Sequence, residues 1–245
     1  MERKINNQQP IKPNDFRYVL LPGTLPEPKH KDTYMHVYDI WKEVWVNAFQ
    51  ELKVDKPFYS DSFTRQDYIG ALFYKNRCFA MAFYRWTDAS RADFVTDSYF
   101  YNWNDDHRKH LRSRGDKIIV CSYFTVHPNG RGSVLGLSGK DLLMGMITKT
   151  FMNSGADAMT GAVRINKGVN TAGEKWGTTL IAGHVDSGYD ADVDLIGFFK
   201  DTIAVHPANE LSDLTEFLWS NSMIIPRIDL SQEFTFALSD QKAAA

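Results

Sequence analysis

The feature that most constrains this chain is the passage from its most apolar segment into a glycine-rich turn and then a helical pattern. The segment Lys117–Val126, "KIIVCSYFTV", is typical of a strand because β-branched and aromatic residues dominate it. The turn that follows, within "VHPNGRGSVLGLSGKDLL", has glycines at positions 130, 132, 136 and 139. A helical pattern then begins, with Ser138 as its candidate cap. A glycine-rich turn between a strand and a helix usually directs backbone amides at an anion, most often a phosphate.

Strands and helices follow one another along the rest of the chain. Strands are expected at residues 16–23, in a hairpin over 68–86, at 117–126, at 157–165, in a second hairpin over 178–201, and at 233–238. Helices are expected from Thr33, as a cap, to before Pro57, from Ser138 to a stop at Gly155, within 166–177 and within 211–223. This order predicts an α/β domain whose central βαβ unit contains the glycine-rich turn.

Composition excludes several classes of protein. Lys and Arg number 28 against 30 Asp and Glu, and no long basic run is present, so nucleic acid is not expected as the main partner. Cys78 and Cys121 are too few for a disulfide framework and predict reduced thiols in a cytoplasmic protein. The first residues lack a signal-peptide pattern, and no run approaches the roughly 18 apolar residues that span a bilayer. No membrane span is therefore expected.

Three kinds of anion site compete for the turn. A nucleotide P-loop would need glycine at position 134, which is valine, and Ser or Thr after Lys140, where Asp141 stands. A dinucleotide fingerprint requires a different glycine spacing. The third is a seat for the diphosphate of an acylated coenzyme, in which successive amides and a helix N-terminus face the diphosphate. An unrelated α/β protein that holds another phosphate is a further alternative.

Here the chain resembles the GNAT superfamily of acyl-CoA-dependent N-acyltransferases. Their motif at the strand-to-helix junction is V-x-P-x-x-[QR]-x-x-G-x-[GA]. Val126, Pro128, Arg131 and Gly136 fall in register with it, whereas Val134 stands where the first motif glycine is expected. The turn of this chain is therefore a divergent version of the motif.

A second segment strengthens the resemblance. Members often carry a stretch similar to N-x-x-A-x-x-L-Y-E-K-L-G-F, and this chain has "NKGVNTAGEKWGT". Asn166, Glu174, Lys175 and Gly177 fall in register. Gly173 occupies the position at which many members have a tyrosine that protonates the departing coenzyme thiolate.

The resemblance implies a GNAT-like α/β fold, with a mixed, mostly antiparallel sheet flanked by helices. It covers residues 33–203, after an N-terminal arm over 1–32 that contains the first expected strand and before a C-terminal extension over 204–245. Residues 88–116 form an insertion with the aromatic residues Phe94, Tyr99, Phe100, Tyr101 and Trp103. These side chains are expected either to wall an apolar acceptor or acyl pocket or to pack under the C-terminal extension.

The resemblance also implies a coenzyme site. Acetyl-CoA or another acyl-CoA is the expected co-substrate, with no metal. The residues implied to bind it are Val126, Gly130, Arg131, Gly132, Ser133, Gly136 and Asn166. No motif position supplies the base, and Tyr123 on the central strand and His184 on the strand after the last helix of the domain are the catalytic candidates. The cluster within "NDDHRKH" favours a solvated loop over a metal site because cations surround it.

The function implied is transfer of an acetyl or longer acyl group from coenzyme A to a primary amine of a small molecule or peptide. A GNAT scaffold that binds acyl-CoA or a protein partner without turnover is one alternative. An acyl carrier protein as donor is another. The sequence is also compatible with a homodimer.

Overall fold

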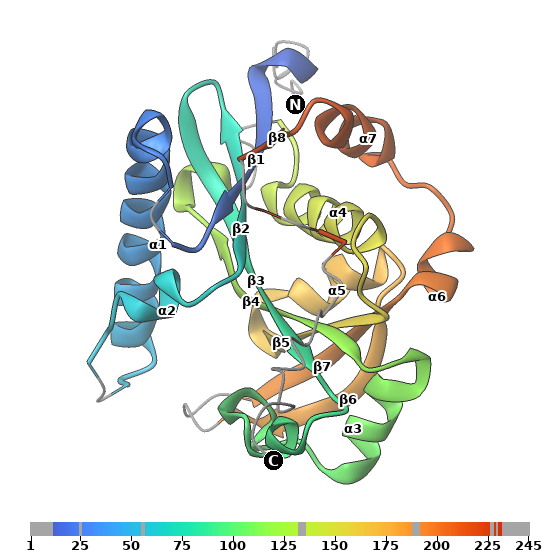
Figure 1. Ribbon diagram of the computed structural model, residues 1–245. Helices are drawn as coiled ribbons and strands as arrows, with labels where there is room; N and C mark the ends of the chain where they lie inside the picture. Colours follow the sequence, from blue (N-terminus) through green and yellow to red (C-terminus); the bar gives the residue numbers. More distant parts are fainter. Residues whose placement is uncertain are drawn as a thin grey trace, which may run out of the picture.

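The computed structural model describes residues 12–24, 26–54, 57–131, 136–187, 192–225, 228, 230 and 231. Within them, eight strands form one sheet in the order β6-β7-β5-β4-β3-β2-β1-β8 (Figure 1). The strands are β1 (Phe16–Pro22), β2 (Tyr68–Tyr74), β3 (Arg77–Asp88), β4 (Lys117–Val126), β5 (Ala158–Arg164), β6 (Thr179–Asp186), β7 (Asp192–Phe199) and β8 (Met223–Ile224). The helices are α1 (Lys31–Glu51), α2 (Asp61–Thr64), α3 (Asp105–Leu111), α4 (Gly139–Met152), α5 (Val169–Glu174), α6 (Lys200–Ala204) and α7 (Ser212–Ser220).

Neighbouring strands are antiparallel except for two pairs. β4 runs parallel to β5, and β1 runs parallel to the two-residue strand β8. The crossover from β4 to β5 passes through α4, because parallel neighbours cannot be joined by a tight hairpin turn. The mixed, mostly antiparallel α/β fold predicted from the sequence is therefore confirmed, and the glycine-rich turn lies in the βαβ unit as expected.

Alternate side chains divide the sheet into two buried faces. On β4, Ile119 and Cys121 belong to the core under α4, whereas Ile118 and Val120 belong to a core on the opposite face. Figure 1 shows α1 on one side of the sheet and α4 on the other. Both faces of the central strands are covered, which explains why β4 reads as a nearly continuous apolar run.

The insertion after β3 covers the sheet on the same face as α1. Its buried side chains Phe94, Phe100 and Trp103 pack against residues of β4, β5 and β7 on that face. The predicted aromatic residues are absent from the lining of the cavity between β4 and β5, so they do not form the expected pocket there. They lie on the opposite face of the sheet from α7 in the described part of the extension, and residues 232–245 lie outside the described residues. Residues 105–111 are the helix α3 rather than a solvated loop, because the side chain of Asn104 caps them by accepting from the His107 amide (2.8 Å).

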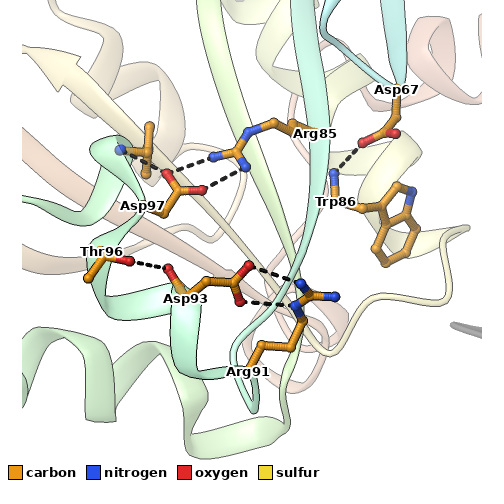
Figure 2. A network of polar contacts seen from close by, with 8 residues as sticks. Asp67, Arg85, Trp86, Arg91, Asp93, Thr96 and Asp97 are labelled. Atoms are coloured by element: carbon orange, nitrogen blue, oxygen red, sulfur yellow. Dashed lines mark hydrogen bonds and ion pairs between the residues drawn. The ribbon is translucent and has the colours of Figure 1, made fainter. Parts of the chain in front are cut away.

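An arginine clamp fixes the start of the insertion on β3. Figure 2 shows the guanidinium of Arg85 making two parallel bonds to the carboxylate of Asp97, at 2.8 and 3.0 Å. Asp97 also accepts from the amide of Tyr99 at 2.9 Å, which caps a short helical turn. A second pair, Arg91 with Asp93, lies nearby and is more exposed. The bidentate pair ties the insertion to the sheet.

The C-terminal extension packs on α4. The ring of Trp219 on α7 lies 6.3 Å from that of Tyr18 on β1, and Lys149 on α4 pairs with Glu216 on α7. The strand expected at residues 233–238 lies outside the described residues. Two helix ends differ from expectation. α1 begins at Lys31 because a short 3-10 helix, Pro28–His30, leads directly into it, and α4 ends at Met152 rather than Gly155.

Candidate active site

A cleft opens in the sheet where β4 and β5 diverge. The two strands pair only across Ile118–Val120 and Ala158–Thr160 in the described structure. Beyond that point β4 continues to pair with β3, and β5 with β7. The gap is a cavity of about 610 Å³ lined by both strands, by α1 on one face and by α4 on the other. A cavity of this size is typical of a site for a small molecule or cofactor.

A β-bulge in β4 accompanies the divergence. Ser122 pairs with Phe83 and Thr125 with Met81, so two residues of β4, Tyr123 and Phe124, oppose a single residue of β3. Tyr123 adopts a left-handed backbone with φ of 51°. The extra residue changes which face each later side chain meets and bends the strand away from β5.

The bulge places Tyr123 in the cleft on the α1 side. Its ring lies 4.9 Å from Trp45 and 5.6 Å from Trp41, both on α1. The indole of Trp45 donates to Thr125 Oγ1 at 2.8 Å and so holds α1 against the bulge. Tyr123 lines the cavity. The structure therefore brings this predicted residue to the cleft, on the opposite face of β4 from Val126. The bulge moves Tyr123 to this face, because regular alternation would place it on the face of Cys121.

Val126 directs its peptide groups into the cleft. The amide of the next residue, His127, donates to Phe79 of β3 at 2.8 Å, so the amide of Val126 points to the other edge of β4. The carbonyl oxygen of Val126 accepts from Nε of Arg131 at 3.0 Å. This bond places the guanidinium of Arg131 at the mouth of the cavity, which Arg131 lines.

Glycines allow the turn to fold tightly against the sheet. A Cβ on Gly130 would lie 2.7 Å from Phe79, and one on Gly139 would collide with the carbonyl oxygen of Gly130. Gly136 has a φ of 70°, which favours glycine. Ser138 caps α4, as predicted, by accepting from the Asp141 amide at 3.2 Å. Two predicted coenzyme-binding residues, Gly132 and Ser133, lie outside the described residues.

Basic side chains gather at the mouth of the cavity. The cavity-lining cations are Arg131, Lys140, Arg164 and Lys167. Lys140 and Lys167 converge there, since the ammonium of Lys140 donates to the Lys167 carbonyl oxygen at 3.4 Å. Glu51 at the end of α1 pairs with Lys167 at 2.9 Å and Arg164 at 3.7 Å, and the hydrogen bond from Lys167 lowers the pKa of Glu51. The cations outnumber the carboxylates here, which suits an anionic ligand.

The sequence reasoning did not find a carboxylate–imidazole pair beside the cleft. Glu43 of α1 lines the cavity, and its Oε1 lies 3.3 Å from Nε2 of His127. Nδ1 of His127 accepts from the Asn129 amide at 3.2 Å, so in the neutral ring Nε2 carries the proton and donates to Glu43. The helical pattern placed Glu43 on α1, but no sequence signal joins it to a loop 84 residues away.

His184 does not overlook the cleft, and that expectation is wrong. It lies on β6, the edge strand, which β7 and β5 separate from β4. Its side chain is 77% exposed, and it is not among the residues that line the cavity. The sequence predicted the strand correctly, but the position of a strand in the sheet depends on long-range pairing that the local pattern does not contain.

Asn166 and Gly173 differ in what they can contribute. Asn166 is exposed in a 3-10 turn after β5, between Arg164 and Lys167, so it lies beside the mouth. Gly173 is buried in α5, and a Cβ there would lie 2.5 Å from Oγ1 of Thr178. This position therefore leaves no room for a tyrosine in the observed packing.

The described part of the chain contains neither a metal cluster nor a membrane-spanning helix. No group of three or more His, Cys, Asp or Glu is arranged there to hold a metal ion. No described helix is long and apolar enough to cross a bilayer. Cys121 lines the cavity, but burial raises the pKa of its thiol to about 12, so it is a neutral thiol rather than a nucleophilic thiolate.

The sheet and its crossover place the chain in the GNAT-like class of folds, as the sequence resemblance predicts. One similar solved structure is FeeM, an N-acyl amino acid synthase from uncultured soil microbes. It has a TM-score of 0.51 and 13% identity over 81% of this chain and 97% of FeeM. Another is BjaI, a CoA-dependent acyl-homoserine lactone synthase solved with SAM and isopentyl-CoA. It has a TM-score of 0.56 and 11% identity over 88% of this chain and 96% of BjaI. No family model and no curated protein matches the sequence.

Proposed function

We propose that this protein transfers an acyl group from coenzyme A to a primary amine. The observation that carries the proposal is the cleft between β4 and β5, whose mouth carries four basic side chains beside the N-terminus of α4. A helix N-terminus and flanking cations bind a diphosphate, and the strand edges beyond it offer peptide groups to an extended chain with amides of its own. Pantetheine is such a chain.

The coenzyme would lie along β4. Arg131 and the amide of Gly136 would hold the diphosphate, together with Gly132 and Ser133 of the same turn. The Gly130 amide, which the sequence resemblance also assigned to the diphosphate, donates instead to the His127 carbonyl oxygen at 2.8 Å, so it does not take part. Asn166 would contact the pantetheine arm near the mouth. The amide of Val126 points into the cleft and would polarise the thioester oxygen, which becomes negative as the amine attacks.

The reaction requires loss of one proton and release of one thiolate. The amine nitrogen attacks the thioester carbonyl carbon, the C–N bond forms, and the C–S bond breaks. We assign Tyr123 to the acceptor side of the bulge, where it would orient the amine, and Glu43 to accept the amine proton through water. A thiol with a pKa near 8.5 is a fair leaving group, so thiolate release without an acid at position 173 is chemically reasonable.

The names of the similar proteins support acyl transfer to an amine. FeeM is an N-acyl amino acid synthase, and BjaI is a CoA-dependent acyl-homoserine lactone synthase. Both names describe acylation of a small amine-bearing acceptor. A small-molecule or peptide amine is therefore the proposed acceptor class for this chain, and acetyl or a longer acyl group is the proposed cargo.

One observation favours a second candidate, a GNAT scaffold that binds acyl-CoA without turnover. The packing of Gly173 against Thr178 excludes the tyrosine that many members of the resembled family use as an acid. Thermal unfolding and thiol release distinguish the two functions. Free coenzyme A and acetyl-CoA should raise the melting temperature of either kind of protein, a transferase or a binding scaffold. Only a transferase should release thiol in proportion to added amine.

Variants refine the test. E43Q should lower kcat by about 100-fold, the lower end of the range of general acid–base effects. Y123F should also lower kcat, because Tyr123 would orient the amine, and coenzyme should still raise the melting temperature of both variants. H184A is the matched control because His184 lies on the far edge strand, and it should leave the rate unchanged. Release from an acyl carrier protein but not from coenzyme A would identify the carrier protein as donor. No thermal shift with any coenzyme would contradict the proposal.

A further inference from the structure

The deep end of the cleft is an apolar well on the α4 side of the sheet. Its side walls come from α4, β5 and β7 and are formed by Met144, Ile147, Val163, Ile196 and Phe198. All five are buried in the core under α4, although they line the cavity. An apolar recess favours hydrocarbon over water or a polar group.

The cleft extends from the mouth past the bulge to the point where β4 and β5 meet, and the well is its inner part. Ile147 lies eight residues along α4 from Gly139 at the mouth, which corresponds to about 12 Å of helix. On β7, Ile196 pairs with Gly161, and Phe198 pairs with Met159 at the level where β4 and β5 are hydrogen-bonded. The well therefore begins beyond the proposed thioester position near Val126 and runs away from the mouth.

Gly161 lies in the wall of this well without any backbone or packing reason to be glycine. Its φ is not in the left-handed region. A Cβ there would make ordinary contacts, 3.4 Å from the Cys121 carbonyl oxygen and 3.8 Å from Ile196 Cγ1. Glycine inside a strand costs stability relative to a residue with a side chain. What glycine provides at this position is empty volume between Val163 and Met159, the residues of β5 on the same face.

We propose that the donor carries an acyl chain longer than acetyl, that the chain fills this well, and that Gly161 sets the depth to which it enters. This inference rests on the proposed acyl transfer and adds its donor class and a specificity-determining residue. The carbonyl carbon stays at the bulge, where the amine attacks from the α1 side, while the hydrocarbon extends between α4 and the sheet. Each methylene buried in the well should tighten binding by about fourfold.

The test compares acetyl-, butyryl-, hexanoyl-, octanoyl- and dodecanoyl-CoA. For the wild-type protein, the melting temperature and kcat/KM for thiol release should rise with chain length until the well is full. G161V should reduce the octanoyl-to-acetyl ratio of kcat/KM by at least tenfold and keep the thermal shift with acetyl-CoA. G161A, whose Cβ fits without displacement, should give an intermediate ratio.

The matched control is G183V. Gly183 lies on the edge strand β6, where a Cβ would also make ordinary contacts, at 3.5 and 4.0 Å, but outside the cavity. Its chain-length profile should match that of the wild type. A wild-type profile that is flat from acetyl to octanoyl would overturn this inference alone, as would a G161V variant that loses acetyl-CoA and octanoyl-CoA equally. Failure of the wild type to bind any coenzyme would overturn the proposed function together with it.

Discussion

At the scale of single residues, Arg131 shows how one side chain can organise a binding site. Its Nε donates to the Val126 carbonyl oxygen, so the remaining N–H groups of the guanidinium form the fork that would meet a diphosphate. We expect R131M to weaken binding of free coenzyme A by roughly 10- to 100-fold, the value of a hydrogen bond to a charged group. R131K should weaken it less, because lysine keeps the charge but loses both the fork and the carbonyl bond. Isothermal titration calorimetry measures each Kd.

The control for Arg131 is another arginine outside the cleft. Arg112 pairs with Asp116 at 2.8 Å at the end of the insertion and does not line the cavity, so R112M should leave Kd unchanged. Binding by the wild type should weaken as salt increases, because the four cations of the mouth are near solvent. Equal Kd values for R131M and the wild type would contradict the proposal that this turn binds the diphosphate.

At the scale of elements, local patterns predicted what each segment is but not where strands diverge. β4 has the predicted bounds, and α4 has the predicted cap, because alternation, helical spacing and capping are encoded within a few residues of one another. The bulge at Tyr123 depends on register with β3, and the cleft depends on β5 turning to β7. Neither feature is a property of one segment. The sequence therefore predicted the glycine-rich turn but not the cavity between β4 and β5.

Residues that meet from distant segments show the same limit. Glu43 and His127 lie on different elements and share no motif, whereas Arg131 and Gly136 were predicted together because one motif contains both. His184 was placed wrongly for the same reason that the cleft was not foreseen: strand order is set by long-range pairing. The insertion was recognised by its length and aromatic content. The sequence did not predict that it packs against β4 and β7 on the α1 face of the sheet.

The insertion gives an element-scale prediction. The Arg85–Asp97 pair is bidentate, and its side chains are only 31% and 20% exposed. Such a pair lies between an exposed ion pair, worth at most about 1 kcal/mol, and a buried one, so R85M should lower the free energy of unfolding by about 2 kcal/mol. Hydrogen exchange should also increase over residues 92–100. Urea denaturation and exchange mass spectrometry measure the two effects.

The neighbouring ion pair serves as the control. Arg91 and Asp93 lie in the same insertion (Figure 2). Their side chains are 54% and 65% exposed. R91M should therefore leave the free energy of unfolding nearly unchanged, because water screens an exposed ion pair. If R85M and R91M were equally mild, the clamp would not hold the insertion on the sheet.

At the scale of the whole molecule, both faces of the sheet contain a buried thiol. Cys78 lies in the core under α1 and Cys121 in the core under α4. Burial raises the pKa of each from 9.0 to about 12, because the thiolate is poorly solvated inside the protein. Burial likewise raises the pKa of Tyr18 from 10.0 to about 12. The free energy of unfolding should therefore depend on pH in the alkaline range, through buried groups on both faces of the sheet.

The direction follows from the raised pKa values. Below about pH 9 both states keep the thiol protons, and the free energy of unfolding is unaffected by them. Between about pH 9 and pH 12 the unfolded chain loses these protons while the folded chain keeps them, so stability falls by about 1.4 kcal/mol per pH unit for each thiol. Urea denaturation under reducing conditions at increasing pH measures this slope.

C78A removes one thiol away from the cleft, so it should lower stability at neutral pH through the lost packing. It should also reduce the alkaline slope by about 1.4 kcal/mol per pH unit. A slope that C78A leaves unchanged would mean that Cys78 is not buried in the folded protein.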